Sequence, residues 1–453
     1  MNKPLPDVKD SYLSQFKALS GNGAEGMPGW LQAIRGAAME QFGATGFPDS
    51  GDERWRFSNM RQLTEATFSL APADTERITR ADIDPHVLAS SADQCLVFVN
   101  GRFAADLSSL GGLPKGVVAT SIGTATKSDL KSAERHLTKY ARPGDNPFTA
   151  LSTAFIVDGG FLFIPPNVVL DKPIQLLFLS VATSTPSVSH PRCLIVAEGG
   201  SAASVVEVYA GHGAGDYWTN AVTEVVVGDN ARLETYRIQQ ESEQAHHTAT
   251  TQSYQARDSV YGLTTVELGA LLSRHDINAV LDGEGAECHL YGLSQLRGRQ
   301  HVDHHTTIEH AKPHCNSWEY FNGIYDERSR GVFTGRIVVQ PGAQQTDSKQ
   351  TNNNLLLSDA ARADSQPQLE IYADDVKCTH GATLGPIDEG ALFYFRSRGI
   401  DAETARNLIT YGFGVEILNK IGIGELRQRL DDVLHSRLDE GADRRRRRRR
   451  MKQ

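Results

Sequence analysis

The sequence predicts a mainly β protein, in which a coiled parallel sheet lies between helical N-terminal and C-terminal segments. Residues 147–386 show almost no helical periodicity and consist of short runs rich in Val, Ile, Thr and Tyr. Within them the pattern Gly-x-x-Ala begins at Gly199, Gly228 and Gly283, at intervals of 29 and 55 residues, the second close to twice the first. Such a repeat is typical of a solenoid whose turns stack on one another.

A β-sandwich is the alternative architecture for the same residues, because three matches to the repeat do not define a solenoid. The polar run Gln344–Asn354 favours the solenoid. Stacked turns accommodate Asn, Gln and Thr side chains in ladders, which the core of a sandwich would exclude. We therefore assign residues 147–386 to a solenoid core.

Two segments precede this core. Residues 1–90 form a predicted helical region, with a break at Gly21-Asn-Gly. Its first apolar helix face consists of Tyr12, Leu13, Phe16 and Leu19. Residues 91–146 are predicted to form a small α/β segment. Its clearest signal is Asn100-Gly101 between two apolar runs, which indicates a hairpin because both residues tolerate the positive φ angles of a type I′ turn.

Helical signals return after the core, over residues 387–440. Asp388 and Asp401 each stand where a helix N-cap is expected, and Gly399 fits the left-handed position that ends a helix. Residues 441–453 carry seven consecutive arginines, Arg444–Arg450. A run of one charge sign is usually solvated, so we predict a disordered basic tail there.

Composition and charge argue against several classes of protein. The chain has 46 Lys and Arg against 55 Asp and Glu, and with seven arginines gathered near its end the rest is strongly acidic. This argues against broad nucleic-acid binding. The five cysteines are scattered without a C-x-x-C pair, which indicates a reducing compartment and neither a disulfide framework nor a zinc finger. No stretch is apolar for long enough to span a membrane, so we expect a cytoplasmic protein without a membrane partner.

Cys378 and His380 are the strongest candidates for a metal site. Alternating apolar residues from Leu369 to Thr379 predict a strand, on which the two side chains share one face about 7 Å apart. That spacing suits two ligands of one metal centre. Lys377 would favour the thiolate, the form that binds soft metals. The alternative is a buried small Cys beside a structural His.

A second cluster is denser in histidine. It runs from His301 to His305 in the order His-Val-Asp-His-His and continues with His310, His314 and Cys315. On a strand His301, Asp303 and His305 would share one face and His304 the other, so only part of the set can converge on one ion. We expect neutral imidazoles on a solvated sheet face and assign no metal role to them.

No catalytic motif is recognisable. A G-x-x-x-x-G-K-[ST] phosphate-binding loop and a G-x-S-x-G nucleophile elbow are both missing from the sequence. A chain of 453 residues without such motifs is more readily a scaffold than an enzyme.

Four passages resemble those of one family. They are Cys378-Thr-His-Gly-Ala-Thr, Phe393-Tyr-Phe-Arg-Ser-Arg-Gly-Ile, Glu53-Arg-Trp-Arg-Phe-Ser-Asn-Met, and His310–Val339 with its Ser-Trp-Glu-Tyr-Phe-Asn-Gly. Together they resemble SufD, the partner of SufB in the SufBCD complex for iron–sulfur cluster assembly. SufB commonly has an acidic residue directly after the histidine of the first passage. Gly381 in that position favours SufD.

The resemblance implies a right-handed parallel β-helix that pairs with SufB through the β-helix ends, and C-terminal helices that bind the ABC-type ATPase SufC. It implies a non-catalytic scaffold that holds no cluster tightly by itself. A transient cluster would form at the interface with SufB, with His380 as a ligand and Cys378 as a weaker candidate. Residues expected near the ATPase are Tyr394, Arg398, Gly399 and Tyr411. Isolated chains could pair with themselves.

Two other functions remain open from the residues alone. A polysaccharide-processing β-helix enzyme would need a cleft lined by several carboxylates, and the acidic residues cluster nowhere obvious in the sequence. A stand-alone metal-binding solenoid protein would be built on the cluster around His301.

Overall fold

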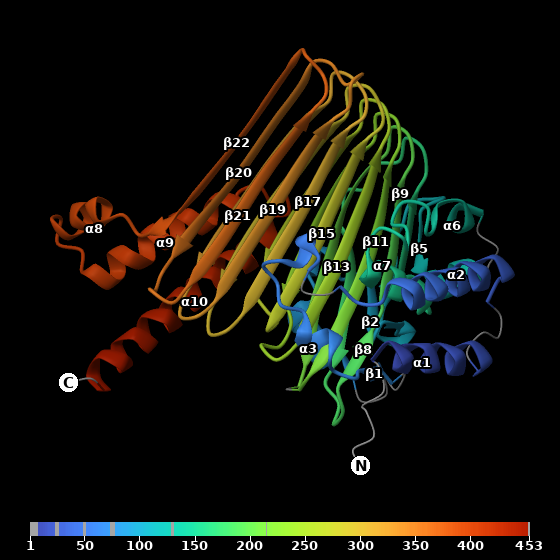
Figure 1. Ribbon diagram of the computed structural model, residues 1–453, viewed down its shortest axis with the longest axis horizontal. Coiled ribbons are helices and arrows are strands. Elements are labelled where there is room, and N and C mark those ends of the chain that lie inside the picture. The colour runs from blue at the N-terminus through green and yellow to red at the C-terminus, as the bar shows by residue number, and fades with distance from the viewer. Residues whose placement is uncertain are drawn as a thin grey trace.

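A computed structural model describes residues 8–22, 27–48, 51–72, 78–127, 131–213 and 215–451. Its centre is a parallel β-solenoid of about 8 turns, built from two sheets whose strands alternate along the chain (Figure 1). This confirms the solenoid and excludes the β-sandwich. Strands β21 and β22 end the two sheets at what we call the open end, and β5 and β3 end them at the closed end.

Sheet A contains the odd-numbered strands from β9 to β21, together with β1, β5, β6 and β8 toward the closed end. From the closed end its strands are β5 (Val118–Ser121), β6 (Gly160–Ile164), β9 (Arg192–Ala197), β11 (Tyr217–Val227), β13 (His246–Gln255), β15 (Leu272–Leu281), β17 (His301–His310), β19 (Arg330–Val339) and β21 (Arg362–Ile371), with β8 (Ser187–Ser189) and β1 (Ser69–Leu70) beside β11.

Sheet B contains the remaining strands. From the closed end these are β3 (Arg102–Phe103), β2 (Gln94–Val99), β7 (Ile174–Val181), β10 (Ala202–His212), β12 (Arg232–Gln240), β14 (Val260–Glu267), β16 (Glu287–Leu296), β18 (Asn316–Tyr325), β20 (Thr346–Leu356) and β22 (Val376–Pro386), with β4 (Ser109–Leu110) paired to β2.

The length of one turn explains the glycine repeat. Arg232 pairs with Val260 and Asn316 with Asp347, offsets of 28 and 31 residues. The repeated glycines lie at corners where a strand of sheet A turns into the next strand of sheet B. A Cβ on Gly228 would lie 2.8 Å from the backbone nitrogen of Gly199, so stacked corners approach too closely for a side chain.

The interior between the sheets is mainly apolar near the closed end. Phe98, Phe178 and Tyr209 stack there on successive strands of sheet B, with ring centroids 4.9 Å apart in both pairs. Each turn buries its apolar face against the next, which is why a single turn would not be stable alone. Toward the open end, polar side chains such as Gln350 and Asn352 enter the interior as ladders.

N-terminal helices cover the outer face of sheet A (Figure 1). Tyr12, Phe42 and Trp218 meet there in an aromatic cluster, with ring centroids 6.1 and 6.4 Å from Tyr12. Of the predicted break at Gly21-Asn-Gly, Gly21 and Asn22 are the last two residues of the first helix, and Gly23 lies outside the described residues. The helices of this part are α1 (Val8–Asn22), α2 (Gly29–Thr45), α3 (Arg61–Thr64) and α7 (Pro147–Ala154), with the 3-10 turn η1 (Glu53–Trp55).

The segment 91–146 joins the closed end of the solenoid. β2 pairs in parallel with β7, and β5 pairs with β6. The predicted hairpin is present between β2 and β3, with φ angles of 52° at Asn100 and 75° at Gly101. Short helices surround this end: α4 (Arg80–Ile83), η2 (Asp84–His86), η3 (Ala89–Ser91), η4 (Ala105–Leu107), α5 (Ile122–Lys127) and α6 (Lys131–His136).

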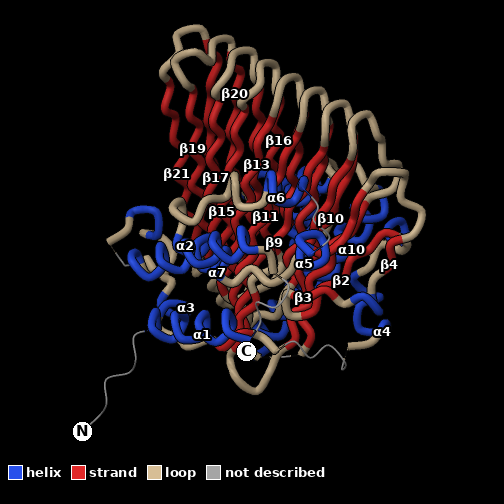
Figure 2. Tube along the Cα trace, turned by 90° about the vertical axis from the view of Figure 1, so that its right-hand side faces the viewer, coloured by secondary structure: helices blue, strands red, loops and turns tan. Residues whose placement is uncertain are grey.

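The C-terminal helices are α8 (Glu389–Arg396), α9 (Ala402–Leu418) and α10 (Gly424–Met451). Asp388 and Asp401 cap α8 and α9 as predicted, and Gly399 has a φ of 84°. α9 and α10 cover the outer face of sheet B, while α8 extends beyond the last strands (Figure 1). Helices gather over one half of the strands and leave the other half uncovered (Figure 2). Among the described helices, none combines the length and the hydropathy of a membrane-spanning segment.

The predicted disordered tail is wrong for residues 441–451, since α10 continues to Met451. Arg445 explains part of the difference. Its guanidinium pairs with Glu403 of α9 at 2.6 Å and with Asp326 of the solenoid at 3.1 Å. Acidic partners on neighbouring elements thus hold Arg445, near the start of the arginine run. Periodicity along the sequence does not reveal these contacts. Residues 452–453 lie outside the described residues.

Candidate functional site

Strands β21 and β22 leave their sheets open. β22 is hydrogen-bonded to β20 and β21 to β19, and neither has a neighbour on its other side within the described parts of the chain. An unpaired edge of this kind offers a row of backbone donors and acceptors to another strand. The open end is therefore a candidate surface for pairing.

The direction of the backbone groups at this edge follows from the register. The N–H groups of Asp347 and Leu357 donate to the carbonyl of the residue before β18 and to that of its last residue, at 3.2 and 2.8 Å. Odd-numbered residues of β20 therefore face β18, and even-numbered ones face β22. In a parallel ladder the register partner of a bonded residue points its own backbone groups the other way. Cys378, His380 and Ala382 pair with even-numbered residues, so their backbone groups face outward.

The direction of the backbone groups on β21 follows in the same way and decides the position of Pro367. The N–H groups of Arg362 and Tyr372 donate to the carbonyl of the residue before β19 and to that of its last residue, at 3.1 and 2.9 Å. The backbone groups of even-numbered residues therefore face β19, and those of Pro367 face outward. A proline without an N–H therefore costs no ladder bond at this position. The outer edge of β21 therefore lacks one backbone donor, at Pro367. The edge of β22 has no such gap before Pro386, its last residue.

Cys378 and His380 share one face of β22, as predicted. Their register partners Ser348 and Gln350 are fully buried inside the solenoid, and neighbours in a parallel ladder point the same way. The two side chains therefore face the interior where it opens. Cys378 is half-buried and His380 is exposed. Whether they bind a metal stays a prediction.

The prediction that Lys377 favours the thiolate of Cys378 is wrong. Partial burial raises the pKa of the Cys378 thiol, and the carboxylate of Asp347 on β20 raises it further. Cys378 also packs at the edge of a small apolar cluster that contains Ile337 and Val339. It resembles the structural cysteine of the alternative interpretation more than a reactive thiol.

A row of polar side chains, which we call the polar file, runs from His380 into the interior through Gln350 and Glu319. Gln350 is the register partner of His380, and the side-chain amide of Gln350 donates to Glu319 at 2.6 Å. Glu319 is buried, which raises its pKa to about 7. The next partner in register is Leu290, so the file ends two strands behind His380. Sequence reasoning missed Glu319. The repeat could have revealed it, because Glu319 lies 31 residues before Gln350, and Gln350 lies 30 residues before His380.

The C-terminal helices divide the four residues predicted near the ATPase into two groups. Tyr394, Arg398 and Gly399 lie together at the end of α8, where the Arg398 guanidinium is 3.5 Å from the Tyr394 ring centroid. Tyr411 lies between α9 and α10. Its hydroxyl donates to Asp431 at 2.8 Å and its ring stacks on that of His435 at 4.2 Å.

Exposed large apolar side chains concentrate in the same part of the chain. Among the described residues six of eight fall between residues 371 and 408, and Phe393 and Tyr394 on α8 are 72% and 54% exposed. Exposed apolar side chains that gather in one region mark interaction surfaces more often than scattered ones do. The six are Ile371, Tyr372, Leu384, Phe393, Tyr394 and Leu408.

The histidine cluster is split between the two faces of β17. The N-terminal segment covers the outer face, where Ser58 bonds His301 at 2.8 Å and Asp303 pairs with Arg274 at 2.8 Å and His305 at 3.2 Å. Burial lowers the pKa of His301 to about 4, so its imidazole is neutral as expected. The expected solvated face is wrong, because packing against the N-terminal segment buries it.

The remaining members of that cluster point elsewhere. His304 faces the interior, His310 is buried against Ser317 at 2.9 Å, and His314 is exposed and pairs with Glu284 at 3.7 Å. A metal site built on the whole cluster is therefore not formed.

A cleft of about 700 Å³ on the outer face of sheet A gathers carboxylates that the sequence analysis did not bring together. Two of them are already engaged, since Asp276 pairs with Arg274 at 2.9 Å and Glu309 accepts from Gln340 at 2.7 Å. Free, converging carboxylates are what glycoside chemistry needs. The cleft gives the polysaccharide-processing function little support.

Comparison with known proteins connects these features. The family described as "SufBD protein N-terminal region" matches residues 6–176, and "SUF system FeS cluster assembly, SufBD core domain" matches residues 178–413. An iron–sulfur cluster assembly SufBD family protein of Synechocystis sp. is 33% identical over 411 residues, which cover 89% of this chain and 90% of that protein.

Two relatives bear the name SufD. That of Escherichia coli is 30% identical over 423 residues, 89% of this chain and 92% of the relative. That of Bacillus subtilis is 28% identical over 444 residues, 95% of this chain and 98% of the relative. The chain therefore belongs to the SufBD family of iron–sulfur cluster assembly proteins and is SufD-like within it.

Proposed function

We propose that this chain is a non-catalytic scaffold subunit that pairs with a SufB-like subunit, binds a SufC-like ATPase and contributes His380 to a nascent iron–sulfur cluster at the interface between the two solenoids. The observation that carries the proposal is the open end, where the unpaired strand β22 places an exposed imidazole on its inner face.

The outward backbone groups of Cys378, His380 and Ala382 support pairing through β22. A strand of the SufB-like subunit could extend sheet B by main-chain hydrogen bonds, which give affinity without requiring a particular sequence. Ile371, Tyr372 and Leu384 are exposed at the same end and would be buried by the partner. Pro367 would restrict the corresponding addition on β21. In isolation, two copies of this chain could pair through the same edge.

Ligand chemistry supports a shared cluster. Iron–sulfur clusters are held mainly by several thiolates, and His380 offers one nitrogen at the open end. Cys378 contributes poorly as a ligand while its pKa is raised. The SufB-like subunit would therefore supply the thiolate, and this chain alone would hold no stable cluster.

The helix α8 supports ATPase binding. It extends beyond the strands (Figure 1). It carries the exposed rings of Phe393 and Tyr394, with Arg398 against the second of them. Aromatic and arginine side chains are enriched at protein interfaces. Since this chain has no phosphate-binding loop, the bound ATPase would supply nucleotide hydrolysis.

Purification of the tagged chain from its native cell tests the proposal. We expect a SufB-like chain and an ABC-type ATPase to co-purify in stoichiometric amounts, and the complex to yield iron and sulfide after anaerobic reconstitution. Size-exclusion chromatography of the isolated chain then measures self-pairing. Recovery of the chain without either partner, under conditions that preserve other complexes, would contradict the proposal.

A further inference from the structure

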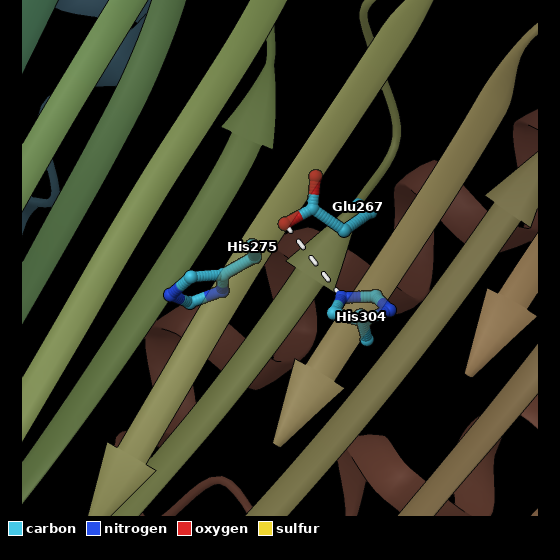
Figure 3. A group of neighbouring side chains, drawn as sticks. All are labelled: Glu267, His275 and His304. Atoms are coloured by element: carbon cyan, nitrogen blue, oxygen red, sulfur yellow. Dashed lines mark ion pairs between the residues drawn. The ribbon is translucent and has the colours of Figure 1, made fainter. Parts of the chain in front are cut away.

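A second group of metal-binding side chains lies inside the solenoid, away from the open end. Glu267 is the last residue of β14, and His275 and His304 are register partners on β15 and β17 (Figure 3). All three are buried, at most 3% exposed. One ligand atom from each lies within 4.8 Å of the others, and this is the one such group of three found in the described part of the chain.

The imidazoles carry nitrogen atoms without partners. His304 Nε2 and His275 Nδ1 are buried, and neither has a hydrogen-bond partner among the described residues. His304 Nε2 lies 4.0 Å from Glu267 Oε1, too far for a hydrogen bond. Figure 3 shows the Glu267 carboxylate and the His304 imidazole facing one another, with the His275 ring on the neighbouring strand. Buried polar atoms are normally satisfied, so two orphaned nitrogens beside a carboxylate point to a missing ligand.

Neighbouring side chains fix the orientation that a metal would need. His275 Nε2 lies 2.8 Å from the Thr251 hydroxyl, and as donor in this bond it leaves the lone pair of Nδ1 free. Ser273 donates to Glu267 Oε2 at 2.8 Å, and Arg237 donates to Oε1. Metal-binding His and carboxylate groups characteristically have such outer partners.

The surrounding interior holds three buried carboxyl groups, Glu207, Glu241 and Glu267, against one guanidinium, Arg237. Glu241 also contacts the His247 imidazole at 2.5 Å, and burial raises the pKa of Glu207. A bound cation would offset this excess of acidic groups, and Arg237 already shows that the site accepts positive charge.

We propose that Glu267, His275 and His304 bind one divalent first-row transition metal ion, Zn²⁺ or Fe²⁺, inside the solenoid. Two imidazoles and one carboxylate suit these borderline cations and disfavour Mg²⁺ and Ca²⁺, which take oxygen ligands. Three protein ligands leave one coordination position open. The proposal does not rest on the function proposed for the open end and uses none of its residues.

Access to the site is restricted. Phe321 lies 5.1 Å from the His304 ring and Phe333 lies 5.1 Å from Phe321, measured between ring centroids, and both belong to strands nearer the open end. Exchange of the metal through this apolar layer requires the solenoid to open. We therefore expect loading during folding and slow removal by chelators.

Metal analysis of the untagged full-length chain tests the site. The chain is expressed with Zn²⁺ supplementation, or with Fe²⁺ and purified anaerobically, then dialysed against EDTA and analysed by mass spectrometry of the elements. We expect about one metal ion per chain in at least one preparation, and at least a tenfold loss in His304→Gln and His275→Gln. His310→Gln is the matched control, because His310 is equally buried with one unpartnered nitrogen but lies outside the triad.

If the triad variants fail to fold, X-ray absorption spectroscopy at the absorption edge of the bound metal identifies its ligands in the wild-type chain. We expect nitrogen and oxygen neighbours without sulfur, and the same spectrum from Cys378→Ser/His380→Ala. A wild-type chain without metal in both preparations, equal metal in a folded His304→Gln variant, or a first shell containing sulfur would overturn the proposal. The last result, or metal loss in the open-end variant, would assign the ion to the open end instead.

Discussion

His380 on β22 stands directly opposite Gln350 on β20, and the side chain of Gln350 in turn donates to the buried Glu319 at 2.6 Å. The exposed imidazole at the open end is thus the outermost member of a file of polar side chains that enters the interior. We therefore expect His380 to affect cluster formation at the surface, and Glu319 to affect the stability of the folded chain.

Replacement of His380 by Ala is expected to leave the assembled complex intact and to lower its iron and sulfide content severalfold. The side chain is exposed, so its loss should change the free energy of unfolding by no more than about 0.5 kcal/mol. Iron and sulfide are measured together with melting temperature and complex recovery. Cys378→Ser is the matched control and should do less. Normal iron and sulfide in an intact His380→Ala complex would remove His380 from the site.

Glu319 should make the chain less stable as the pH rises from about 4.5 to about 7. Burial raises its folded-state pKa to about 7, so in this window the unfolded chain ionises while the folded chain stays protonated. The free energy of unfolding should fall by about 3 kcal/mol between pH 4.5 and pH values above 7, and it should not be lowered by Glu319 below pH 4.5.

Glu319→Gln should remove this part of the pH dependence, because the amide does not titrate and can still accept from Gln350. Denaturation midpoints of wild type and variant at pH 5, 6, 7 and 8 measure the effect. The exposed Glu389→Gln serves as control. Parallel curves for wild type and Glu319→Gln would show that Glu319 does not titrate in this range.

Two proline substitutions on β22 distinguish pairing from folding. Ala382→Pro removes an outward N–H and should weaken binding to the SufB-like subunit while leaving the melting temperature of the isolated chain nearly unchanged. Gly381→Pro removes an N–H that bonds β20, and should lower the melting temperature. A Cβ meets no atom within 4 Å at Gly381, so the added side chain itself causes no clash.

Affinity for the SufB-like subunit is measured by titration calorimetry, and melting by circular dichroism. If Ala382→Pro bound the SufB-like subunit as tightly as wild type, the edge of β22 would not be the pairing surface.

Replacement of Phe393 by Ser together with Tyr394 by Ala should weaken ATPase binding at least tenfold without changing the melting temperature. Both rings are exposed in the isolated chain, so they contribute little to its stability. The matched control is Leu110→Ser, an exposed apolar residue at the closed end. Pull-down of the ATPase at several concentrations measures the change. Binding at full strength would move the docking surface away from α8.

Local patterns in the sequence determined much of this protein. The glycine repeat predicted the length of a solenoid turn, Asn100-Gly101 predicted a hairpin, and Asp388 and Gly399 predicted the two ends of a helical segment. Side-chain alternation placed Cys378 and His380 on one strand face. Each of these depends on φ angles or on a period of two residues, which neighbouring residues fix by themselves.

Tertiary structure decided what depends on stacking between turns and on the elements that cover the sheets. Glu319 lies behind His380 because successive turns are in register, and Glu267 meets His275 and His304 because the two sheets face one another across the interior. Burial, absent from any local pattern, set the pKa of Cys378 against the expected effect of Lys377. Acidic partners from separate elements likewise keep Arg445 in a helix where charge repulsion alone predicts disorder.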